Sequence, residues 1–73
     1  MKLAIVIDKD DNSDFCVYSP DIDGCIAVGG TKEEAIALYS QAVERYLRDL
    51  RETGQKPPRP QAMVETIEVS DIA

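Results

Sequence analysis

The chain has 73 residues and a formal net charge of −6, with 44% hydrophobic and 30% charged residues. This length predicts one domain over residues 1–73, and the composition excludes a disordered chain. The sequence has no apolar run near the roughly 18–20 residues of a membrane-spanning helix, and its acidity disfavours direct binding to nucleic acid or anionic membranes. The charge favours a basic partner, or it serves only to keep the protein in solution.

Alternating apolar residues predict a first strand over Lys2–Asp8. Its apolar run is shorter than that of a signal peptide and ends at an acidic residue, so we expect a cytoplasmic protein. A polar turn over Lys9–Ser13 leads into a second strand, Asp14–Ser19. Because the connection is short, these two strands are predicted to form an antiparallel hairpin.

Turn residues occupy Pro20–Gly24, and a short strand of small residues is predicted over Cys25–Val28. Two glycines end that strand. Thr31 and Glu34 then have the spacing of a capping box, in which the threonine hydroxyl accepts a hydrogen bond from the third helical amide. The pair therefore predicts the start of a helix.

The helix is predicted to run from about Lys32 to Thr53, because apolar residues recur along it at helical spacing. The apolar stripe consists of Ala35, Ile36, Tyr39, Ala42, Val43, Tyr46, Leu47 and Leu50. Gly54 is expected just past the helix end, and prolines make Gln55–Pro60 an extended connector. A last strand is predicted over Met63–Val69.

The order of elements predicts an α+β fold, β-β-β-α-β, with a mostly antiparallel four-stranded sheet and one long helix on one face. Both faces of the first hairpin are apolar. We assign one face to the helix (Leu3, Ile5, Ile7, Phe15 and Val17), which leaves the other without cover (Ala4, Val6, Cys16 and Tyr18). The simplest cover is a second copy of the chain, so we expect a homo-oligomer, most simply a dimer.

The residues predict no catalytic site, cofactor or metal. Cys16 is expected opposite Val28 and apart from Cys25, so both cysteines are predicted to be small buried residues without a disulfide. Without histidine the chain lacks the commonest general base and a good zinc set. One enzymatic alternative stays open, a metal-dependent nuclease that uses Asp8 and acidic residues of the last strand.

Residues Tyr18–Ala35 carry a motif with fixed separations between turn, cysteine, cap and helix start. Its structural residues are Tyr18, Pro20, Gly24, Cys25, Gly29, Thr31, Glu34 and Ala35. An aromatic residue precedes Pro-Asp-Ile-Asp-Gly-Cys, and Gly-Gly-Thr-Lys-Glu-Glu-Ala opens the helix. This motif resembles that of the HicB family of small antitoxins, and the resemblance covers nearly the whole chain. The chain looks like a short, single-domain HicB-like member without a DNA-binding C-terminal domain.

The resemblance implies a truncated RNase H-like fold without nuclease activity. It also implies an antidote that binds HicA, a small basic ribonuclease toxin, and blocks cleavage of mRNA. The acidic hairpin and the turn after it are the expected partner-binding residues: Asp8, Asp10, Asp11, Asp14, Asp21 and Asp23. A solitary accessory or self-assembling domain with another client is the alternative.

Overall fold

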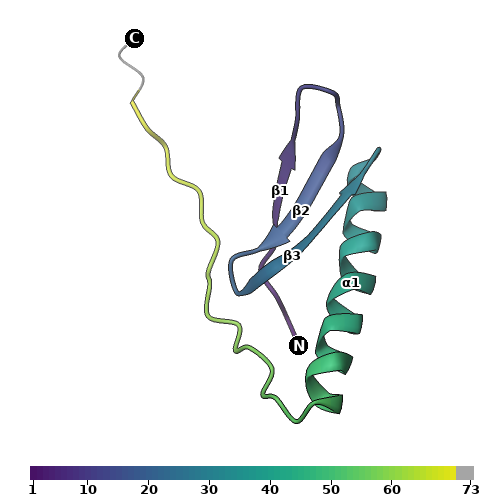
Figure 1. Cartoon of the computed structure of the whole chain (residues 1–73). Coiled ribbons are helices and arrows are strands. Elements are labelled where there is room, and N and C mark those ends of the chain that lie inside the picture. Colours follow the sequence, from purple (N-terminus) through teal and green to yellow (C-terminus); the bar gives the residue numbers. More distant parts are fainter. Residues whose placement is uncertain (71–73) are drawn as a thin grey trace.

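Three strands precede one long helix in the computed structural model, which describes residues 1–70 (Figure 1). The elements are β1 (Val6–Lys9), β2 (Phe15–Ser19), β3 (Ile22–Gly29) and α1 (Lys32–Glu52). The strands form one antiparallel sheet in the order β1-β2-β3. The α+β arrangement predicted from the element order is therefore confirmed for these four elements.

The β1–β2 hairpin is closed by an aspartate in its turn. The Asp10 carboxylate accepts hydrogen bonds from the amides of Asn12 and Asp14 at 2.9 and 3.0 Å. The expected start of the first strand at Lys2 is wrong, because β1 begins at Val6. Val6 lies opposite Tyr18, one residue before β2 ends, so the residues that precede β1 have little of β2 left to pair with.

The β2–β3 connection is tighter than predicted. Ser19 pairs with Ile22, so the turn consists of two residues, and β3 starts three residues before the expected Cys25. Tyr18 nevertheless pairs with Ile26, which leaves residues 23–25 as an irregularity in the ladder. Gly24 lies within it at φ +79°, a conformation that glycine adopts without strain.

Both ends of α1 follow the sequence prediction. The Thr31 hydroxyl accepts a hydrogen bond from the Glu34 amide at 3.1 Å, which is the expected N-cap. At the other end Gly54 has φ +74°, its amide donates to the Arg51 carbonyl, and the Gln55 amide donates to the Leu50 carbonyl. This pair of bonds is a Schellman motif, which ends the helix.

The core lies between the sheet and the first half of α1. Val17, Ala35 and Tyr39 form its buried centre, and Ile5 and Ile7 pack against them half-buried. These contacts confirm the predicted helix-facing side of the hairpin. The helix packs chiefly on β3 and then on β2. The inner side of β1 is consequently the least covered part of the sheet.

The predicted fourth strand is absent from the described chain. Residues 62–70, called here the C-terminal arm, run as an extended segment that diverges from the sheet (Figure 1). Within the described residues its bonds to the body are those of the Ala62 amide, which donates to both carboxylate oxygens of Asp21 at 3.2 Å. Because no neighbouring strand pairs with the arm, its alternating pattern does not become a strand in the single chain.

Candidate functional site

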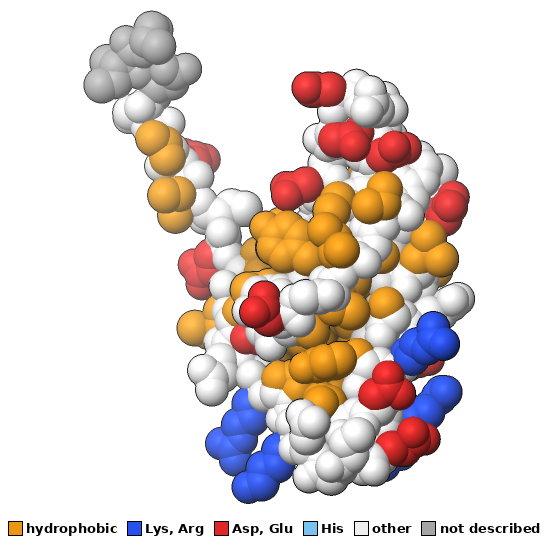
Figure 2. Space-filling model, in the orientation of Figure 1, with side chains coloured by type: hydrophobic (Ala, Val, Ile, Leu, Met, Phe, Trp, Pro, Cys, Tyr) orange, Lys and Arg blue, Asp and Glu red, His pale blue; other side chains and the backbone are white. Residues whose placement is uncertain are grey.

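The outer face of the sheet, opposite α1, carries a continuous apolar surface. Strand register places Val6, Tyr18 and Ile26 in one row, and Cys16 and Val28 in the next. Ile26 is 61% exposed and Val28 54% exposed, and Figure 2 shows hydrophobic side chains gathered over the sheet. These five residues are called here the outer face. A surface of this kind marks an interaction site on a small domain.

The sequence predicted part of this surface. Val6, Cys16 and Tyr18 were expected on the uncovered side, and the register confirms that they share it. Ile26 and Val28 were missed, because the third strand was not divided into faces. The predicted pairing of Cys16 with Val28 contains the missing signal, since directly paired residues point to the same side of a sheet.

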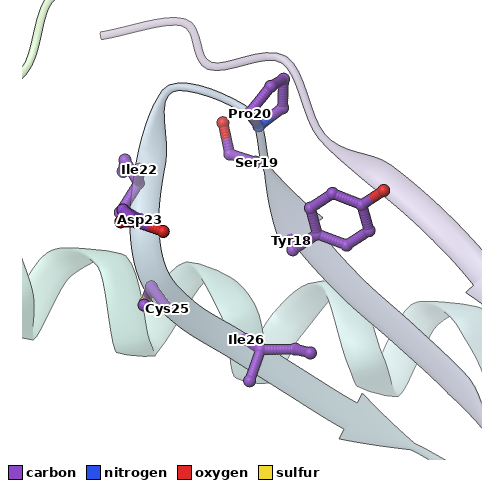
Figure 3. A pocket seen from close by; sticks show the side chains of 8 residues that line it. Tyr18, Ser19, Pro20, Ile22, Asp23, Cys25 and Ile26 are labelled. Carbon is purple, nitrogen blue, oxygen red and sulfur yellow. The ribbon is translucent and has the colours of Figure 1, made fainter.

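A hollow of about 480 Å³ lies beside the β2–β3 turn and includes half of the motif residues (Figure 3). Its lining is Tyr18, Ser19, Pro20, Ile22, Asp23, Gly24, Cys25 and Ile26. The side chain of Cys25 points toward α1 and packs against the core. At the ladder irregularity, Cys25 of the motif therefore faces the core, while the other motif residues of the hollow lie at its open edge.

Beneath this turn the hydroxyl of Tyr39 is buried without a hydrogen-bond partner among the described residues. Burial raises the pKa of Tyr39, and the nearby thiol of Cys25 raises it further. The Ser19 backbone opposes this rise in pKa, but it makes no hydrogen bond of good geometry with the hydroxyl. The tyrosine is consequently held neutral in the core.

The six predicted partner-binding aspartates do not form one site. Asp10, Asp11 and Asp14 lie at the tip of the β1–β2 hairpin, and the pairing of Phe15 with Gly29 places this tip at the same end as the start of α1. Glu33 and Glu34 of the first helical turn join the three aspartates there. These five residues are called here the acidic end.

Figure 2 shows acidic side chains crowded at this end and every visible lysine and arginine in the other half. The two glutamates were not predicted as partner-binding residues, because some twenty positions separate them from the hairpin. The predicted capping box located the helix start and was the available signal.

The other three predicted aspartates have different surroundings. Asp8 pairs with Cys16 and shares the side of the outer face. Asp21 and Asp23 lie by the β2–β3 turn, at the opposite end of the sheet from the hairpin tip. Asp21 accepts both bonds from Ala62, so its role in this structure is to hold the start of the C-terminal arm.

The described residues contain no group of three histidine, cysteine, aspartate or glutamate side chains that could hold a metal ion. Cys16 and Cys25 are free thiols, one toward the outer face and one in the core. Glu65 and Glu68 are exposed on the unpaired arm. Among residues 1–70, Asp8, Glu65 and Glu68 are therefore not gathered into a group that could hold a metal ion.

Within residues 1–70, no helix is long and apolar enough to cross a membrane. The fold, with its apolar outer face and acidic end, is that of a small α+β protein suited to contacts with other proteins. A family model described as "HicB_like antitoxin of bacterial toxin-antitoxin system" matches residues 3–73. The chain belongs to this family of antitoxins.

Three proteins similar to the chain are each named UPF0150 protein. A UPF0150 protein of Thermoplasma acidophilum is 33% identical over 67 residues, which cover 92% of this chain and 97% of the relative. A UPF0150 protein of Helicobacter pylori is 40% identical over 50 residues, or 68% of each chain. A third, from Synechocystis, is 26% identical over 66 residues, covering 90% of this chain and 84% of the relative. No solved structure is significantly similar.

Proposed function

We propose that the chain is an antitoxin that binds and neutralises a small basic ribonuclease of the HicA type in the cytoplasm, and so blocks cleavage of mRNA. It acts by protein–protein contact and not by catalysis. The acidic end is the observation that carries this proposal, together with membership of the antitoxin family.

The acidic end suits a basic partner because its charges are concentrated. Five carboxylates from the hairpin tip and the first helical turn share one end of the sheet, where Lys9 and Lys32 also lie, so this end keeps an excess of negative charge. The lysines and arginines visible in Figure 2 lie in the opposite half. Such asymmetry steers a partner of opposite charge and orients its approach. Asp11 is the best single contact, since it is exposed, whereas Asp10 is occupied by two turn amides.

Capture from the native host tests the proposal. At low salt, the immobilised chain is expected to retain a small basic protein that, once purified, cleaves RNA and loses this activity on addition of the chain. The Asp11→Asn/Glu33→Gln variant should bind this protein about 10-fold more weakly or worse, because charge pairs at interfaces contribute substantially to association. Asp49→Asn/Glu52→Gln, which removes two exposed carboxylates near the other end of α1, is the matched control. A captured protein without ribonuclease activity would contradict the proposal.

We further propose that the chain is a homodimer in which a second copy covers the outer face. The exposed apolar side chains of Ile26 and Val28 are stabilised there by burial at about 25 cal/mol per Å². Light scattering is expected to give twice the chain mass of 8.1 kDa at micromolar concentration. Ile26→Asp should give a folded monomer, because it places a carboxylate in the apolar contact. A mass of one chain for the unsubstituted protein would refute the dimer.

A further inference from the structure

We propose that the C-terminal arm of each copy adds as a fourth strand to the β1 edge of a second copy, so that two chains exchange arms. This assignment deepens the dimer proposed above by naming the segment that joins the copies. Three features carry it: the composition of the arm, an open groove beside β1, and the failure of the arm to pair within its own chain.

The arm has the alternating apolar pattern of a β-strand but pairs with no other strand. Met63, Ile67 and Val69 lie at odd positions and are 91%, 82% and 76% exposed, and Val64 is 65% exposed on the other side. Four large apolar side chains are thus exposed to water within nine residues. A contiguous apolar surface of this kind is typical of a segment that binds a partner. A period of two is the pattern of a strand with one buried side.

The β1 edge of the sheet, which would receive the arm, is only partly covered by α1 on its inner side. β1 is the edge strand farther from α1, which packs chiefly on β3 and β2. Between the residues that lead into β1 and the helix lies a groove of about 420 Å³, lined by Met1, Leu3, Ile5, Tyr39, Ser40, Val43, Glu44 and Leu47. A strand beside β1 would direct alternate side chains into this groove. It would also supply partners for the backbone groups that β1 leaves unpaired.

The charges of the two segments are compatible with this pairing. The arm carries Glu65 and Glu68, and the N-terminal segment with β1 carries Lys2 and Lys9 near its two ends. Glu65 lies between Met63 and Ile67 on the same side of the arm. In the proposed pairing this carboxylate would enter a groove that offers the hydroxyl of Ser40 as a donor and also carries the like charge of Glu44.

The single chain does not close the groove with its own arm. Ala62 is held at Asp21, close to where β1 begins, yet residues 63–70 leave the sheet and make no strand pairing. The radius of gyration is 14.8 Å, against about 11 Å for a compact chain of this length. The arm is therefore fixed to its own chain at Ala62, and residues 63–70 are left without a strand partner.

The reach of the arm is sufficient for exchange. Eight residues beyond Ala62 span about 26 Å when extended, and two sheets that stack face to face are about 10 Å apart. An arm can therefore cross from one copy to the β1 edge of a copy stacked on the outer face. Cover of the outer face and exchange of arms are compatible in one symmetric dimer.

Substitution in the arm tests the exchange in the full-length chain. Ile67→Asp is expected to weaken dimerisation by at least about 30-fold in dissociation constant, the effect of a central interface side chain. The monomer released should keep its helical signal at low temperature, because the arm makes no core contact within its own chain. Its melting temperature should fall, because association stabilises the folded chain and is lost. Ser70→Asp, with the same added charge at a polar position, should leave the dimer unchanged. A dimer unaffected by Ile67→Asp would overturn the exchange while leaving the outer-face dimer standing.

Cross-linking distinguishes exchange from closure within one chain. In a background with Cys16 and Cys25 replaced by serine, one variant carries Val64→Cys and a second carries Ala4→Cys. Mixing them with a short bismaleimide is expected to give a cross-linked pair of chains. With both substitutions in one chain, a cross-linked species of single-chain mass would show that the arm folds onto its own edge and would refute the proposal.

Discussion

Replacing Gly29 by alanine is expected to lower the free energy of unfolding by about 1–3 kcal/mol, the usual effect of overpacking a tight contact. A Cβ at this position would lie 2.7 Å from the backbone nitrogen of Ala35 and 3.0 Å from its Cα. Both contacting atoms belong to the helix backbone, so neither can move aside as a flexible side chain would. The end of β3 and the first turn of α1 would have to separate.

Thermal unfolding followed by circular dichroism measures this effect. Each kcal/mol lowers the melting temperature of a domain of this size by roughly 4–8 °C. Gly30→Ala is the matched control, because a Cβ there would meet only a carboxylate oxygen of Glu34 at 3.9 Å. Equal melting temperatures for the two variants would contradict the close approach at Gly29.

Only part of the role of Gly29 could be predicted from the sequence. The sequence predicted a strand end and a helix cap there, and both are confirmed by β3 and Thr31. It did not predict the contact with Ala35, because the distance between strand and helix depends on how the two elements pack. Local chemistry therefore located the elements, and tertiary packing gave the glycine its second role.

The predicted fourth strand does not form in the single chain, and the reason is again one of tertiary packing. Met63–Val69 has the alternation of a strand, but a strand also needs a neighbour with free hydrogen-bonding groups, and periodicity carries no information about one. The acidic end was likewise predicted only in part. The hairpin aspartates were found, whereas Glu33 and Glu34 join them only through the antiparallel pairing of Phe15 with Gly29.

Tyr39 gives the second large effect, and two substitutions separate the contributions of its ring and its hydroxyl. Tyr39→Ala should cost about 3–5 kcal/mol, the usual effect of truncating a buried aromatic residue. This is a large share of the total stability of about 4–11 kcal/mol expected for 73 residues. Tyr39→Phe should be neutral or stabilising, because the buried hydroxyl has no hydrogen-bond partner among residues 1–70.

The pH dependence of unfolding is an independent test of this buried hydroxyl. Burial raises the pKa of Tyr39 in the folded chain above its ordinary value of 10.0, so the unfolded chain loses this proton first as the pH increases. The free energy of unfolding is therefore independent of this group below pH 10.0 and falls as the pH rises through the folded-state pKa, because only the unfolded chain ionises freely. Denaturant titrations from about pH 8 upward should show this decline in the unsubstituted chain and a smaller decline in Tyr39→Phe. Tyr18→Phe is the control: it removes an exposed hydroxyl and should keep the full decline. Equal declines for the unsubstituted chain and Tyr39→Phe would show that the hydroxyl of Tyr39 is in contact with water.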